Sequence, residues 1–122
     1  MSHLVTIKTQ MKDAVALAAA CRRLGLAEPV RETVHLFSGQ ATGLAVRLPK
    51  WQFPVVVDVE IGAVHFDNFE GNWGEQKQLD MLLQAYAVER TRLEARKKGY
   101  AVQETTLQDG SIKLQILEGA TP

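Results

Sequence analysis

The sequence predicts an α+β fold, an antiparallel twisted sheet with two helices packed on one face, in the order β-α-β-β-β-β-α-β-β. Two segments repeat apolar residues at helical intervals, and seven short segments alternate polar and apolar residues as strands do. The central hairpin has one apolar and one mostly polar face, which is typical of a sheet covered by helices on one side only. We expect one domain over residues 1–118 and a disordered tail over 119–122.

The first strand and the first helix lie in the first 30 residues. Alternation predicts a strand over Leu4–Gln10, and Asp13 then begins a helix. Gly25 and Pro29 end this helix. Its apolar stripe contains Ala14, Leu17, Ala18, Cys21 and Leu24.

Four strands are expected in the middle of the chain. They cover Thr33–Phe37, Leu44–Leu48, Phe53–Glu60 and Ala63–Phe69. The last two are joined at Ile61-Gly62. An isoleucine is unfavourable at positive φ, so a loop one residue longer stays an alternative.

A two-residue turn would determine the register of this hairpin. Val57 would face Phe66 on the apolar side, and Asp58 would face His65 on the polar side. The polar face would then carry a histidine beside a carboxylate.

The second helix is long and is followed by a hairpin. Asn72 and Glu75 resemble a capping box, and the helix is expected to reach about Lys98, with Gly99 as its cap. The closing strands are expected over Tyr100–Thr106 and Ile112–Ile116, with a turn at Asp109-Gly110.

Composition excludes several classes of protein. Fourteen Lys and Arg balance fourteen Asp and Glu, which excludes a strongly basic nucleic-acid binder and an acidic disordered tail. The one cysteine, Cys21, excludes a disulfide or a cysteine-ligated metal within one chain, and no cofactor is expected. Arg22 and Arg23 could lower the pKa of this thiol, but its place on the apolar stripe favours a buried, inert side chain. The longest apolar stretch is Ala14–Ala20, so we expect a soluble cytoplasmic protein that does not enter membranes.

Short motifs along the whole chain resemble those of one known family. They are Met1-Ser2-His3 with Thr6–Thr9, Gly39-Gln40 after an aromatic residue, Gln84–Ala87, Gly99-Tyr100, and Asp109–Ile112 with Leu114. On these residues the chain resembles the hypothetical chloroplast reading-frame thirty-five family, a domain of unknown function. The resemblance implies a small α+β protein and no assigned reaction. It also implies a partner, either an AAA-type ATPase or a small companion protein.

The chain departs from this family pattern in its centre. Relatives often carry a more aromatic stretch where this chain has Val55–Val59, and a Trp pair where it has Trp73 alone. If that region is the working surface, the specificity of this chain differs from that of its relatives.

One candidate site combines His65 with Asp58 and Asp67 on the polar sheet face. A histidine hydrogen-bonded to a carboxylate is the arrangement that a general base or an oriented metal ligand needs. The alternative is an ordinary cross-strand pair that stabilises the sheet.

A second candidate site consists of loop aromatics. Trp51, Phe53 and Trp73 lie in or beside loops, where aromatic residues often contact a binding partner. The alternative is that they close the open end of the core.

A third candidate is the basic end of the second helix. Its cations are Arg90, Arg92, Arg96, Lys97 and Lys98, which could contact phosphates. Glu89 and Glu94 interrupt the cluster, and cations are common at helix C-termini, so a solvated face is the alternative.

These patterns favour a non-enzymatic protein-interaction or adaptor module without catalytic residues. The uncovered sheet face and the loop aromatics would bind a protein partner or a second copy in a homo-oligomer. The alternatives are a metal- or small-ligand-binding protein using His65 and Asp58, and a nucleic-acid binder using Arg90–Lys98. Opposed acidic and basic patches would favour head-to-tail or heteromeric docking; the acidic patch consists of Asp58, Glu60, Asp67 and Glu70.

Overall fold

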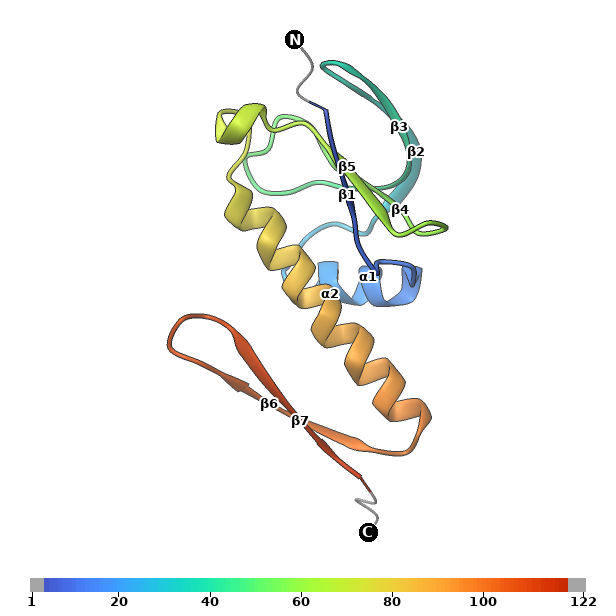
Figure 1. Cartoon of the computed structure of the whole chain (residues 1–122), viewed down its shortest axis with the longest axis vertical. Coiled ribbons are helices and arrows are strands. Elements are labelled where there is room, and N and C mark those ends of the chain that lie inside the picture. Colours follow the sequence, from blue (N-terminus) through green and yellow to red (C-terminus); the bar gives the residue numbers. More distant parts are fainter. Residues whose placement is uncertain (1–3, 119–122) are drawn as a thin grey trace.

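The computed structural model describes residues 4–118 and has seven strands, two α-helices and a short 3-10 helix (Figure 1). The predicted tail over 119–122 lies outside these residues. The elements are β1 Val5–Lys8, α1 Ala14–Arg23, β2 Val30–Leu36, β3 Gly39–Val46, β4 Val55–Asp58, β5 Ala63–Phe66, η1 Phe69–Gly71, α2 Gln76–Lys97, β6 Ala101–Thr106 and β7 Ile112–Leu117.

The predicted α+β class is confirmed. Five strands form an antiparallel sheet in the order β1-β5-β4-β3-β2, and both helices pack on one face of it. Val55, Val57 and Val64 on that face are fully buried, and so are Leu17 of α1 and Leu79 of α2. This shared layer is the main core.

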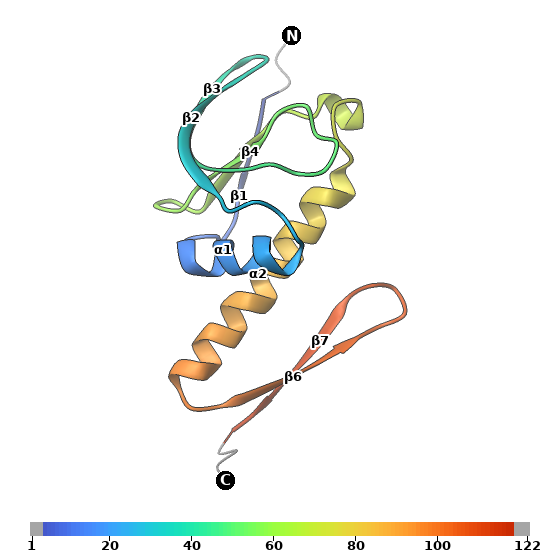
Figure 2. The same cartoon turned by 180° about the vertical axis from the view of Figure 1, so that it is seen from behind.

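The last two strands form a sheet of their own, separate from the other five. The reason is the length of α2, whose 22 residues carry the chain about 33 Å from the N-terminus of the helix. In both views the β6–β7 hairpin lies apart from the main sheet, beside α2 (Figure 1 and Figure 2). The hairpin therefore follows α2 and does not join the main sheet.

The predicted register of the β4–β5 hairpin is wrong by two residues. Asp58 faces Ala63, and Val56 faces His65, so the loop contains four residues, 59–62. In the longer loop Gly62 has a positive φ (74°), which glycine adopts easily. Ile61 does not have a positive φ. Side chains keep their predicted faces, because a shift of two preserves the alternation.

The second face of the main sheet is not mostly polar, as the sequence suggested. Val34 and Leu36 of β2 pack there with Val56 in a second apolar cluster. The cluster forms because the β2–β3 hairpin curls over the sheet, until Gly39 lies near Leu4 beside the opposite edge strand (Figure 1). Part of the face that was expected to be free is therefore covered by the chain itself, while Thr6 and Lys8 of β1 stay exposed on it.

The helix ends follow local chemistry, with one exception. Asp13 caps α1 by accepting hydrogen bonds from two backbone N–H groups, as expected. At the end of α2, Gly99 has φ of 75°, and Tyr100 N–H donates to the Ala95 carbonyl. The capping box predicted at the start of α2 is absent: Glu75 occupies the N-cap position, without a side-chain hydrogen bond.

Tyr86 joins α2 to the loop between β1 and α1. Its hydroxyl accepts hydrogen bonds from the backbone N–H of Lys12 (3.1 Å) and Asp13 (3.0 Å), and it donates to the Gln10 carbonyl (3.2 Å). The ring is buried in the main core. One side chain thus positions the start of α1.

We expect Tyr86→Phe to lower the free energy of unfolding by about 1–3 kcal/mol, because two backbone donors lose their acceptor in a partly buried place. Urea denaturation measures the change. Tyr100→Phe is the control, since its hydroxyl makes no hydrogen bond within residues 4–118. Equal losses in the two variants would contradict this role.

Candidate functional site

The predicted histidine–carboxylate site is not assembled. His65 Nδ1 lies 2.8 Å from the Thr6 hydroxyl, and Asp58 accepts a hydrogen bond from the backbone N–H of Glu60. Asp67 is fully buried, and neither of its carboxylate oxygens has a hydrogen-bond partner among residues 4–118. The three side chains therefore lie in three different environments.

No metal site replaces it in the described part of the chain. Within residues 4–118, no group of three or more His, Cys, Asp or Glu side chains could hold a metal ion. Burial, helped by nearby Glu28, raises the pKa of the Cys21 thiol to about 11, so the thiol is protonated at neutral pH.

Trp51 supports the start of α2. Its indole Nε1–H donates to the Glu75 carbonyl (3.1 Å), and its ring meets Phe66 edge-on. A Cβ on Gly74 would lie 2.4 Å from the indole, so only glycine fits at that position. The contacts of Trp51 therefore have a structural role, which is to hold the start of α2.

Trp73 lies at the centre of a group of phenylalanines. Its ring centroid is 4.8 Å from that of Phe69, 5.3 Å from Phe37 and 5.8 Å from Phe53. Phe69 and Glu70 both have positive φ, a strained conformation that the loop needs in order to reach this arrangement. This aromatic cluster lies at one end of the main sheet, as the alternative interpretation proposed, and its binding role stays a prediction.

Most of the basic end of α2 is neutralised. Arg90 pairs with Glu94 and Asp13, Arg92 pairs with Glu104, and Lys97 pairs with Glu94. Within residues 4–118 the other two cations, Arg96 and Lys98, form no ion pair. Asp67, a member of the predicted acidic patch, is buried and does not lie on the surface. The two opposed patches are weaker than the sequence suggested.

An ion network that was not predicted joins α1, α2 and the hairpin. Both terminal nitrogens of Arg23 donate to the Glu104 carboxylate, at 3.0 and 2.7 Å, and Arg23 Nε donates to Glu89 at 2.9 Å. Arg92 adds a further bond to Glu104 at 2.8 Å. The hydrogen bond from Arg23 is the main cause that lowers the pKa of Glu104, and the same bond raises the pKa of Arg23.

The hairpin that this network holds buries little of its own surface. None of the six residues of β6 and none of the six of β7 is buried. Ile116 is 47% exposed and Leu117 is 40% exposed. Each strand pairs only with the other, so among the described residues both outer edges lack a neighbouring strand. A two-stranded hairpin of this kind is marginal by itself.

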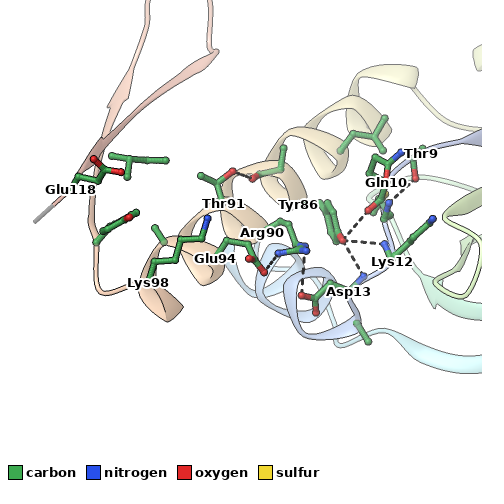
Figure 3. Close-up of a pocket in the computed structure, with 17 residues that line it drawn as sticks. Thr9, Gln10, Lys12, Asp13, Tyr86, Arg90, Thr91, Glu94, Lys98 and Glu118 are labelled. Atoms are coloured by element: carbon green, nitrogen blue, oxygen red, sulfur yellow. Dashed lines mark hydrogen bonds and ion pairs between the residues drawn. The ribbon is translucent and has the colours of Figure 1, made fainter.

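A groove of about 1150 Å³ runs between the hairpin, α2 and the β1–α1 loop. Figure 3 shows Tyr86 and the Arg90–Glu94 pair along it. Apolar side chains in the lining include Leu83, Tyr100 and Ile116, and charges of both signs lie among them. An open groove with mixed chemistry suits a polypeptide segment better than a small charged ligand.

We expect Glu104→Gln to loosen the hairpin without unfolding the main domain. Its amides should exchange with solvent about tenfold faster, because the charge-assisted bonds from Arg23 and Arg92 are weakened. Hydrogen exchange followed by NMR measures this. Glu28→Gln, which removes an exposed pair with Arg22 away from the hairpin, should leave the hairpin amides unchanged.

The same network predicts a response to acid. Because the folded-state pKa of Glu104 is lowered, its stabilisation is complete above the ordinary value of 4.5 and is lost as the pH falls through the lowered value. The amide shifts of β6 and β7 should therefore stay constant above about pH 5 and change below it, before the main sheet unfolds. A hairpin that titrates identically in Glu104→Gln would contradict this assignment.

Within residues 4–118, no helix is both long and apolar enough to cross a membrane. Comparison of the chain with protein-family models, curated proteins and solved structures finds no match.

Proposed function

We propose that this chain is a non-enzymatic protein-interaction module whose binding element is the β6–β7 hairpin with the groove beside it. One observation carries the proposal: the hairpin is held by an ion network, contributes no buried residue and leaves both strand edges open. Open edges are sites where another polypeptide can add a strand.

The other surfaces considered are less suited to this role. Part of the second face of the main sheet is covered by the curled β2–β3 hairpin, and Trp51 is engaged with Glu75. Trp73 packs among three phenylalanines. For a nucleic-acid surface, only Arg96 and Lys98 of the basic helix end lack ion pairs within residues 4–118.

The groove would add side-chain contacts to a docked strand. Ile116 of β7 lies on its wall, and Leu83 and Tyr100 provide further apolar surface. Paired charges such as Arg90 and Glu94 would supply hydrogen bonds at the rim. This combination of an apolar centre and a polar rim is typical of protein interfaces.

The family resemblance suggests two partners, an AAA-type ATPase and a small companion protein, and both remain proposals. We further propose a cytoplasmic location, because the single buried thiol suits a reducing compartment.

Capture from a lysate of the source cell tests the proposed function. Immobilised protein should retain a defined set of proteins, and Ile116→Lys should lose it, because a charge in the half-exposed apolar position blocks docking. Ile61→Lys is the matched control, since Ile61 is an exposed isoleucine (63%) in the β4–β5 loop.

Retention of the same proteins by wild type and by Ile61→Lys, with loss in Ile116→Lys, supports the hairpin as the binding element. Retention by all three forms, or by none, would contradict it.

A further inference from the structure

We infer that the chain which adds to this hairpin is a second copy of the same protein, joined antiparallel through β7 about a two-fold axis at Leu114. The inference rests on the proposed function and specifies the partner. It would make one four-stranded sheet in the order β6-β7-β7-β6 across two copies.

The edge of β7 has few of the features that prevent strand addition. Six consecutive residue pairs join β6 and β7 without a bulge, and neither strand contains proline. Lys113 is the single charged residue of β7. An edge lysine is one of the features that discourage strand addition, and Lys113 is the one such residue in β7.

Symmetry restricts the register to a few choices. Facing residues of antiparallel strands lie on the same face, so a two-fold axis must pass through a residue and not between two. An axis at Lys113 would oppose two lysines, and an axis at Gln115 would place Ile112 against Glu118. An axis at Leu114 avoids both conflicts.

The register centred on Leu114 is complementary on both faces. On the face toward α2, Leu114 meets its own copy, and Ile112 meets Ile116 of the second copy. On the outer face, Lys113 meets Gln115 of the second copy. Apolar pairs of this kind stabilise a sheet, and the contact of Lys113 with Gln115 sets no charge against a like charge.

The edge of β6 does not offer the same match. An axis at Glu104 would oppose two carboxylates, and an axis at Gln103 would place Val102 against Glu104. Glu104 is also engaged with Arg23 and Arg92. Self-addition therefore favours β7.

Pairing with a second copy would also stabilise the hairpin, which is marginally stable by itself. A sheet of four strands is stable where two are marginal. Ile116, which is 47% exposed in one copy, would gain the side chain of Ile112 as a neighbour. The net charge of zero adds no general repulsion between copies.

Charge variants at Gln115 test the inference by sedimentation equilibrium of the full chain. Gln115→Lys would set two lysine pairs across the axis and should weaken the dimer at least fivefold, an effect that shrinks in high salt. Gln115→Glu would set two Lys–Glu pairs and should strengthen it about fivefold. Gln103→Lys is the matched control, because Gln103 faces Gln115 within the hairpin on the same exposed face, away from the axis.

A dimer that Gln115→Lys weakens, Gln115→Glu strengthens and Gln103→Lys leaves unchanged supports the inference. A monomer at every concentration, or a dimer equally affected by all three variants, would overturn it. If a monomeric protein still loses its captured proteins through Ile116→Lys, the proposed function stands and only the second copy is excluded as the partner.

Oxidative cross-linking independently tests whether the two-fold axis passes through Leu114. Leu114→Cys should link two copies, because residue 114 faces itself at about 5 Å between Cβ atoms. Gln103→Cys should not, and the buried Cys21 does not compete. Equal linking of the two variants would contradict the axis.

Discussion

The bidentate bond between Arg23 of α1 and Glu104 of β6 ties the C-terminal hairpin to the helices, and bonds from Arg92 to Glu104 and from Gln84 to the Gly110 carbonyl add to it. The hairpin has no buried residue of its own, so its packing gives it little orientation. The planar guanidinium keeps its charge at any ordinary pH and bonds Glu89 of α2 as well as Glu104. Three elements distant in sequence, α1, α2 and β6, are thereby held together.

The main sheet buries most of its apolar side chains within the chain itself. Both helices cover one face, and the curl of β2 and β3 buries Val34 and Leu36 on part of the other, whereas Val30 and Phe37 stay exposed. The aromatic cluster around Trp73 lies at the end of the same sheet. We propose that the hairpin, whose outer strand edges have no neighbouring strand among the described residues and whose Ile116 is half-exposed, is the part that binds another chain.

Local patterns predicted much of the fold, because they act over a few residues. The α+β class, the Asp13 cap and the glycine end of α2 all follow from such signals. The register at Asp58 was missed because turn length depends on which residue accepts positive φ, and Gly62 does so here. The candidate site was missed because Arg23 and Glu104 are 81 residues apart, and no local pattern joins two charges at that separation.

The central claim is that β7 is an edge which a second copy completes. Hydrogen exchange of the backbone amides as a function of protein concentration tests it most directly. Protection of the β7 amides should rise with concentration, while protection of β4 in the main sheet stays constant. Protection of β7 that is the same at all concentrations would contradict the claim.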